Sequence, residues 1–298
     1  MDDDSVKMKE KLYFLNNISQ CKRFAVEQKR FTSEEIENHA LWLKKDGLEI
    51  PFVEYAVTTR CSLHCRKCSN LIPYFNNPFD IELPEAKNEI RELLDCVDYI
   101  YRFKIHGGEP FLYSDITELL NWICGIDNIG EIRISTNGTI IPHQNVIYAL
   151  KNPKVIVFIS GYSSKIAPRR DELIRLLNQN GVRIRDLHDQ VWNDTGEVIY
   201  RNYSKQKLKE IIRNCSMANC KTLRDHRLYL CSRCSNGDQL GFFHEKRTAD
   251  LSKGSIEEKK REIKNLYTLD DCTGCGYCSG VIAGINEIPP AEQLKENQ

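Results

Sequence analysis

The sequence lacks the features that would direct the chain to a nucleic acid or a membrane. Its 298 residues carry 42 Lys and Arg against 42 Asp and Glu, so no net charge favours a phosphate backbone or an anionic lipid surface. No apolar run reaches membrane-spanning length, and the acidic start, residues 1–5, lacks the positive charge of a signal peptide. We therefore expect a cytoplasmic protein with neither a nucleic-acid nor a membrane partner.

A disulfide framework is also not expected. Thiols stay reduced in the cytoplasm, so metal binding explains thirteen cysteines better than disulfides do. Disulfides in a secreted protein are the alternative. Cys21, Cys96 and Cys124 lie in segments with helical patterns, where a core or surface thiol needs no metal. The other ten cysteines fall into two groups.

From residue 51 onward, β-rich runs alternate with helical patterns. The predicted strands are 52–58, 99–105, 131–135, 154–160 and 183–187, and the predicted helices are 85–97, 116–124, 144–150 and 170–179. This alternation predicts an α/β fold, a partial (β/α)6 TIM-like barrel with its chemistry at the carboxyl ends of parallel strands. Residues 7–48 read as charged helical segments that pack against the barrel, with a capped helix start at 33–38.

Three cysteines, Cys61, Cys65 and Cys68, follow the first predicted strand at spacings of three and two residues. Thiolates so placed can close on one inorganic cluster. Three are one fewer than the four that normally hold a [4Fe–4S] cluster, so one iron stays open to a small molecule. Zinc is the alternative, but it prefers four closed ligands, and the triplet has only His64 nearby as a further donor.

The triplet resembles the CxxxCxxC signature of the radical S-adenosylmethionine (SAM) superfamily, in which the open iron binds the amino and carboxylate groups of SAM. The resemblance implies a [4Fe–4S] cluster and SAM as cofactors. It further implies reductive cleavage of SAM to methionine and a 5′-deoxyadenosyl radical. A reductant such as flavodoxin or ferredoxin is then an expected partner.

The second predicted strand ends in His106-Gly-Gly-Glu-Pro110. Two glycines let the backbone approach a ligand closely, and a carboxylate can accept hydrogen bonds from an ammonium group, although ordinary loops use the same residues. The run matches the GGE(P) motif of the superfamily, which implies that Gly107, Gly108 and Glu109 bind the amino group of SAM.

The next two strands end in Ser135-Thr-Asn-Gly138 and Ser160-Gly161. Both resemble family positions that meet the ribose and carboxylate of SAM, which implies that Asn137 and Ser160 bind it. Asn-Gly is also a common turn dipeptide. Lys67 departs from the family pattern, because many members place an aromatic residue there against the adenine.

Seven cysteines crowd the C-terminal part of the chain: Cys215, Cys220, Cys231, Cys234, Cys272, Cys275 and Cys278. Apolar strand-like runs at 228–230 and 240–243 and a charged helix predicted at 256–265 accompany them. The arrangement resembles the twitch or SPASM extension of radical SAM enzymes, which holds auxiliary iron–sulfur clusters. The family's hairpin glycine is replaced here by His226. Seven thiols can hold one four-thiolate cluster but not two.

One auxiliary [4Fe–4S] cluster is therefore expected. Its favoured ligands are Cys220, Cys231, Cys275 and Cys278, with Cys215 and Cys272 as alternates. Cys234 is then a spare thiol, and we expect it to donate a hydrogen atom to the substrate radical. The alternative is a zinc site that pairs Cys231-x-x-Cys234 with Cys272-x-x-Cys275.

The resemblance covers roughly residues 50–280 and suggests three regions. These are a helical N-terminal extension (1–50), a barrel core (51–213) and an auxiliary-cluster region (214–298). It implies an oxidoreductase or epimerase acting on a small polar molecule such as a sugar or aminocyclitol. A ribosomal peptide is the alternative substrate, and a non-catalytic iron–sulfur or zinc protein the alternative class. In a polar loop after the fifth strand, His188, Trp192 and Asp194 either contact substrate or form a solvated turn.

The cysteine groups yield the first test. Anaerobic reconstitution should load about eight irons per chain, as two four-iron clusters, and the triple variant Cys61→Ala, Cys65→Ala, Cys68→Ala should load about four. Iron and sulfide analysis measures both. Cys124→Ala, outside both groups, is the control and should retain about eight irons. Tight zinc binding without iron in the unaltered protein would contradict the radical SAM hypothesis.

Overall fold

The computed structural model describes residues 48–294 apart from 189 and 283. Residues 1–47, which contain the predicted helix and Cys21, lie outside the described residues. Within these residues, no helix combines the length and the apolar character needed to cross a membrane.

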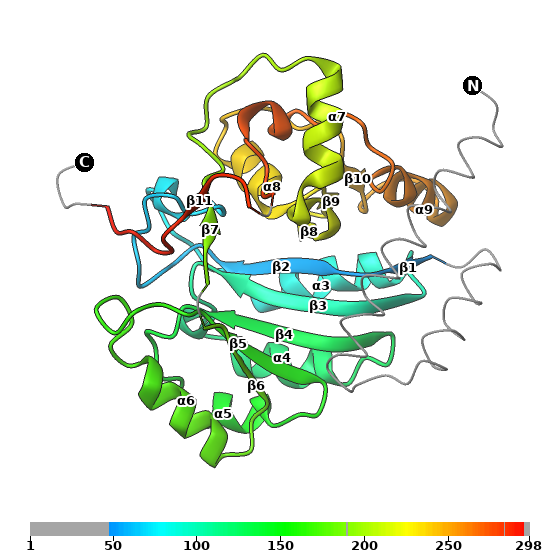
Figure 1. Ribbon diagram of the computed structural model, residues 1–298. Helices are drawn as coiled ribbons and strands as arrows, with labels where there is room; N and C mark the ends of the chain where they lie inside the picture. Colours follow the sequence, from blue (N-terminus) through cyan, green and yellow to red (C-terminus); the bar gives the residue numbers. More distant parts are fainter. Residues whose placement is uncertain (1–47, 189, 283, 295–298) are drawn as a thin grey trace.

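A mostly parallel sheet organises the fold (Figure 1). Its strands β2 (Val53–Thr58), β3 (Tyr99–Gly107), β4 (Ile129–Thr136), β5 (Val155–Ile159) and β6 (Ile184–Asp186) pair in parallel in sequence order. A later strand, β8 (Lys221–Arg224), pairs in parallel with the other side of β2. Because β6 and β8 are separated by the whole width of the parallel sheet, the barrel stays open. The predicted α/β partial barrel is confirmed.

Helices connect successive parallel strands, as right-handed crossovers require. They are α3 (Leu83–Leu94), α4 (Ile116–Cys124), α5 (Gln144–Leu150) and α6 (Arg170–Gln179). The last three have the predicted bounds. Helix α3 lies two to three residues earlier than predicted, because Pro84 sits in its first turn, where a missing N–H costs nothing.

The C-terminal region extends the same sheet and adds three helices. Figure 1 shows α7 (Lys205–Asn214), α8 (Ser232–Gln239) and α9 (Ile256–Asn265) gathered above β2, whereas α5 and α6 lie at the opposite end of the sheet. The strands β9 (Arg227–Tyr229) and β10 (Ala249–Asp250) continue the sheet antiparallel beyond β8. Helix α9 confirms the prediction at 256–265 and begins with a capping box between Ser255 and Glu258.

Two details of this region differ from the sequence prediction. The strand expected at 240–243 is wrong, because Leu240 caps the end of α8 and Gly241 turns the chain with φ of 73°. The β8–β9 turn has positive φ at both Asp225 (49°) and His226 (57°), as a two-residue type I′ hairpin needs. His226 thus adopts the backbone conformation that glycine adopts more easily.

Short elements complete the described chain. The strand β1 (Glu49–Ile50) pairs with β3, and β7 (Trp192–Asn193) pairs antiparallel with β11 (Glu287–Ile288). Single-turn 3-10 helices occur at Ile72–Tyr74, Pro110–Leu112, Ser216–Asn219 and Gly274–Tyr277.

One apolar core joins the barrel to the C-terminal region. Phe103 and Ile134 from the barrel belong to the same buried cluster as Leu223 of β8 and Ile263 of α9. Burial of this shared apolar cluster therefore stabilises both regions.

This core generates a stability test. Ile134 on β4 is fully buried, so Ile134→Ala removes apolar burial and leaves a cavity, which should lower the free energy of unfolding by about 2–5 kcal/mol. Ile199→Ala is the control, since that side chain is 65 % exposed, and its effect should stay within about 0.5 kcal/mol. Urea unfolding measures both. Equal effects of the two substitutions would argue against the position of β4 in the core.

Candidate active site

The main cavity of the protein lies beside the cysteine loop that follows β2. It has a volume of about 390 Å³, and all three thiols of Cys61, Cys65 and Cys68 line it. Loop backbone contacts fix their spacing, since the Cys68 N–H donates to the Cys65 carbonyl at 3.2 Å and the Thr59 N–H to the Phe79 carbonyl at 2.8 Å. Three cysteines that line one cavity fit a cluster that keeps one iron open toward that cavity.

The carboxyl ends of neighbouring strands form the cavity wall next to these thiols. Gly107 ends β3 and Gly108 follows it, Asn137 follows β4 and Ser160 follows β5, and all four line the cavity. The structure thus brings together four of the five residues predicted to bind SAM. Parallel strands produce this arrangement because their carboxyl ends share one rim.

The two glycines allow a contact that no other residue could make. A Cβ on Gly107 would lie 2.3 Å from the Thr58 carbonyl oxygen, and one on Gly108 would lie 2.1 Å from that of Arg60. The Gly108 N–H donates to the Thr58 carbonyl at 2.9 Å. The turn therefore packs directly on the backbone that leads into Cys61.

Glu109, the fifth predicted residue, is fully buried below the cavity surface. Its carboxylate accepts hydrogen bonds from the Phe111 N–H (3.2 Å), the Thr136 hydroxyl (2.8 Å) and the Asn137 N–H (2.8 Å). Burial raises its pKa to about 7. In this arrangement the carboxylate ties the end of β3 to the end of β4.

Asn137 links that rim to the cysteine loop. Its side-chain amide donates to the Ser62 hydroxyl at 3.0 Å, and its nitrogen lies 3.6 Å from the Cys61 sulfur. Its amide oxygen accepts from the N–H and the hydroxyl of Thr139. The side chain is thus oriented between the thiol and the strand end.

Charged side chains from the middle of the strands line one wall of the cavity, and the sequence did not reveal them. Glu54 on β2 pairs with Lys104 on β3 at 2.7 Å, and Arg133 on β4 pairs with Glu131 at 2.5 Å; of these residues, Glu54, Lys104 and Arg133 line the cavity. Although burial acts to raise it, the charge of Lys104 holds the pKa of Glu54 below its usual value. Charged residues within otherwise apolar buried strands were the signal available in the sequence.

His106 and two aromatic rings complete this wall. His106 is 4 % exposed, and burial lowers its pKa to about 3, so the imidazole is neutral. Its Nε2 atom is buried and has no hydrogen-bond partner among the described residues. Phe158 and Phe52 flank the Arg133 guanidinium, with ring centroids at 4.5 and 5.4 Å.

The polar loop after β6 contributes one of its three predicted residues to the cavity. Trp192 lines the cavity and packs edge-on against Tyr162, with ring centroids 6.0 Å apart. His188 is exposed and pairs with Asp186 at 2.9 Å. Asp194 binds Lys67 at 3.3 Å, and Lys67 also pairs with Glu197 at 2.8 Å. Lys67, the residue that departs from the family pattern, is therefore engaged in ion pairs.

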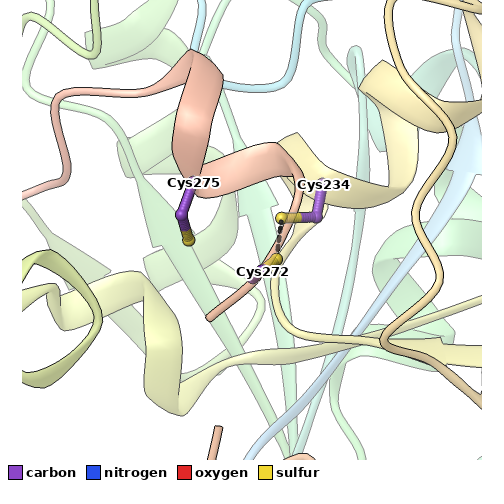
Figure 2. Close-up of side chains that lie close together, drawn as sticks. All are labelled: Cys234, Cys272 and Cys275. Carbon is purple, nitrogen blue, oxygen red and sulfur yellow. Dashed lines mark hydrogen bonds between the residues drawn. The ribbon is translucent and has the colours of Figure 1, made fainter. Parts of the chain in front are cut away.

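The C-terminal cysteines gather at a second, smaller cavity. Cys215, Cys231, Cys234, Cys275 and Cys278 line it. Figure 2 shows Cys234, Cys272 and Cys275 close together; their sulfur atoms lie within 4.8 Å of one another, and those of Cys234 and Cys272 are 3.3 Å apart. Cys272 also donates to the buried carboxylate of Glu245 at 3.0 Å, a contact the sequence did not reveal.

Two cysteines occupy positions that differ from their predicted roles. Cys220, a favoured ligand of the auxiliary cluster, lines the main cavity and not the second one. Cys234, the expected hydrogen-atom donor, is buried in the second group. Its neighbours there are the thiols of Cys231, Cys272 and Cys275. Sequence spacing could not separate the two, because the fold places Cys220, just before β8, at the main cavity and Cys234, on α8, at the second one.

A family model described as the Radical SAM superfamily matches residues 55–226, more than half of the chain. The chain belongs to the radical SAM superfamily. The matched range contains the cysteine triplet, the GGEP turn and the strand ends that line the main cavity. Members of this superfamily use a [4Fe–4S] cluster and SAM, and the C-terminal cysteine group indicates an auxiliary cluster.

The radical SAM relatives match only parts of the chain. A GTP 3′,8-cyclase from Lactiplantibacillus plantarum is 33 % identical over 91 residues, which cover 29 % of this chain and 26 % of that protein. One from Pelotomaculum thermopropionicum is 28 % identical over 98 residues, 32 % of this chain and 30 % of that protein. The chain therefore spans less than a third of the length of these curated relatives.

Among solved structures, BtrN in complex with AdoMet and 2-DOIA aligns with a TM-score of 0.48 and 14 % identity, covering 82 % of this chain and 97 % of that chain. SuiB from Streptococcus suis aligns with a TM-score of 0.39 and 20 % identity, covering 60 % of this chain and 40 % of that chain.

The buried carboxylate gives the test of this site. Glu109→Ala removes the acceptor that orders Asn137 and the GGEP turn, and a hydrogen bond to a charged group contributes about 1.5–3 kcal/mol. SAM affinity of the reconstituted protein should therefore fall about tenfold or more, as measured by calorimetric titration. Glu118→Ala, on the exposed face of α4, should leave the affinity unchanged. Unchanged affinity in Glu109→Ala would remove Glu109 from SAM binding.

Proposed function

We propose that this radical SAM enzyme abstracts a hydrogen atom from a small polar molecule, such as a sugar or aminocyclitol, and oxidises or epimerises it. The supporting observation is the wall of the main cavity, where Glu54, Lys104, His106 and Arg133 present hydrogen-bond donors and acceptors beside the cysteine triplet. A ribosomal peptide is the alternative substrate.

In this proposal the triplet Cys61, Cys65 and Cys68 holds the SAM-binding cluster. Gly107, Gly108, Glu109, Asn137 and Ser160 form the SAM site, with Glu109 acting by ordering the strand ends. When bound, the cluster and SAM supply the 5′-deoxyadenosyl radical. The chain's own part is to hold the substrate carbon near that radical and to exclude water.

The charged wall supports a substrate rich in hydroxyl or amino groups. Glu54 and Lys104 neutralise each other, as do Glu131 and Arg133, so the wall attracts no strongly charged ligand. Carboxylate oxygens accept from hydroxyl and ammonium groups, and the Lys104 ammonium donates to hydroxyls. The neutral imidazole of His106 has one nitrogen that donates and one that accepts. Phe52, Phe158 and Trp192 add apolar faces for the carbon skeleton.

For the auxiliary cluster, we propose ligands drawn from the thiols that line the second cavity, Cys215, Cys231, Cys234, Cys275 and Cys278. Cys272 lies directly beside this set, bonded to Cys234 and Glu245. We further propose three regions: the N-terminal extension (1–50), the barrel core (51–213) and the auxiliary-cluster region (214–298). A flavodoxin or ferredoxin in the cytoplasm is the proposed reductant.

Cys220 then takes the role expected of Cys234. It lines the main cavity, and burial raises its pKa far above the usual value, so it keeps the S–H hydrogen that a donor needs. In epimerisation this S–H bond breaks and a new C–H bond forms on the substrate radical. The resulting thiyl radical regains one electron from an iron–sulfur or flavin reductant and one proton from solvent. In oxidation, the substrate radical instead loses one electron to a one-electron acceptor and one proton to solvent.

Isotope labelling decides between these outcomes. A thiol exchanges its proton with solvent, so turnover in heavy water by an epimerase should place one deuterium on the inverted carbon, and Cys220→Ala should form 5′-deoxyadenosine without epimer. An oxidation product instead loses two hydrogens and carries no label. Mass spectrometry of the product measures both.

Iron content separates a catalytic role of Cys220 from a ligand role. Cys220→Ala should retain about eight irons, whereas Cys231→Ala, the matched variant in the second group, should lose about four. Iron loss from Cys220→Ala would make Cys220 a ligand. An unchanged, unlabelled product would leave oxidation as the reaction.

A further inference from the structure

A segment near the C-terminus crosses over the cysteine triplet. It begins with β11, which pairs with β7 at Trp192 and Asn193, and it reaches the triplet at an antiparallel bridge between Gln293 and Cys65. We call residues 287–294 the strap. The strap thus joins the cavity wall that contains Trp192 to the loop that contains the cluster ligands.

Backbone hydrogen bonds fix the strap on both sides of Cys65. The Arg66 N–H donates to the Glu292 carbonyl at 2.8 Å, and the Leu294 N–H donates to the His64 carbonyl at 2.8 Å. Within the strap, Ala291 is fully buried and adopts a left-handed conformation with φ of 57°. A non-glycine residue in this conformation persists only where surrounding contacts determine it.

The Gln293 side chain is held with its amide group against the Cys65 sulfur. Its oxygen accepts from the His64 N–H at 2.8 Å, and its nitrogen donates to the Ala291 carbonyl at 2.6 Å and to the Cys65 sulfur at 3.3 Å. The accepting contact settles which end of the amide faces the loop N–H. The donating end is therefore directed at the thiol.

We propose that Gln293 is a positioning residue that raises the reduction potential of the SAM-binding cluster by donating an amide hydrogen bond to the Cys65 thiolate. Hydrogen bonds to ligand sulfurs are one of the factors that set the potentials of iron–sulfur clusters. Reduction adds negative charge to the cluster and its thiolates. A donor at the sulfur stabilises that charge more in the reduced state than in the oxidised state, which makes the cluster easier to reduce.

The experiment uses the full chain with both clusters reconstituted and without substrate. Gln293→Leu removes the donor, and Gln293→Glu keeps the acceptor for the His64 N–H while replacing the donor with a carboxylate. The midpoint potential is measured by an EPR-monitored redox titration. The signal that changes on addition of SAM identifies the cluster held by Cys61, Cys65 and Cys68.

Both variants should retain iron and show a lower midpoint potential at the SAM-sensitive cluster, with the larger shift in Gln293→Glu. The SAM-insensitive cluster should keep its potential. Glu292→Gln is the matched control: its side chain lies next in the strap, is 65 % exposed and pairs with Arg66 at 3.8 Å without touching a thiol. Both clusters of this control variant should have the same midpoint potentials as in the unaltered protein.

Two results would overturn the proposal. Midpoint potentials equal to that of the unaltered protein in both Gln293 variants would show that the hydrogen bond does not affect the cluster. Loss of iron from both variants would show that the side chain only holds the loop. Because no substrate is present, either result leaves the proposed reaction untouched.

Discussion

Close packing of the GGEP turn on the backbone before Cys61 is the constraint on which the active site depends. A Cβ on Gly108 would lie 2.1 Å from the Arg60 carbonyl oxygen, so only glycine permits this approach. The contact sets the cysteine loop directly against the end of β3. The Glu109 carboxylate then fixes the end of β4 to the same point through Thr136 and Asn137. The cysteine loop and the strand ends proposed to bind SAM are thereby held together by the glycine packing and the Glu109 hydrogen bonds.

The same rim separates two chemical environments. Above the strand ends lie the thiols and the residues assigned to SAM, whereas the strand interiors carry Glu54, Lys104 and Arg133. Buried charges of this kind destabilise a fold unless they are paired, and here each pairs with a neighbour of opposite sign. A barrel of purely apolar strands would be simpler to stabilise. The retained polar groups are therefore best explained by a ligand that needs them.

Much of the barrel could be predicted from the sequence because its signals are local. The helices α4, α5 and α6 have the predicted bounds since their apolar periodicity matches their burial, and the cysteine triplet and GGEP turn are recognisable by spacing alone. The positions of Cys220 and Cys234 could not be predicted, because they depend on where the fold places the start of β8 and the helix α8. The strap was missed for a related reason. Gln293 and Cys65 are 228 residues apart, and no local pattern reports such a contact.

The pairing of β8 with β2 has a consequence for electron movement. Val53 pairs with Lys221, the residue after Cys220, so the strand that leads to the triplet and the strand that follows Cys220 share one hydrogen-bonded ladder. Cys220 and the triplet therefore cannot move far apart without breaking that ladder. In the proposed reaction, an electron that passes between the SAM-binding cluster and the Cys220 sulfur would thus cross a distance set by two paired strands and not by a loop.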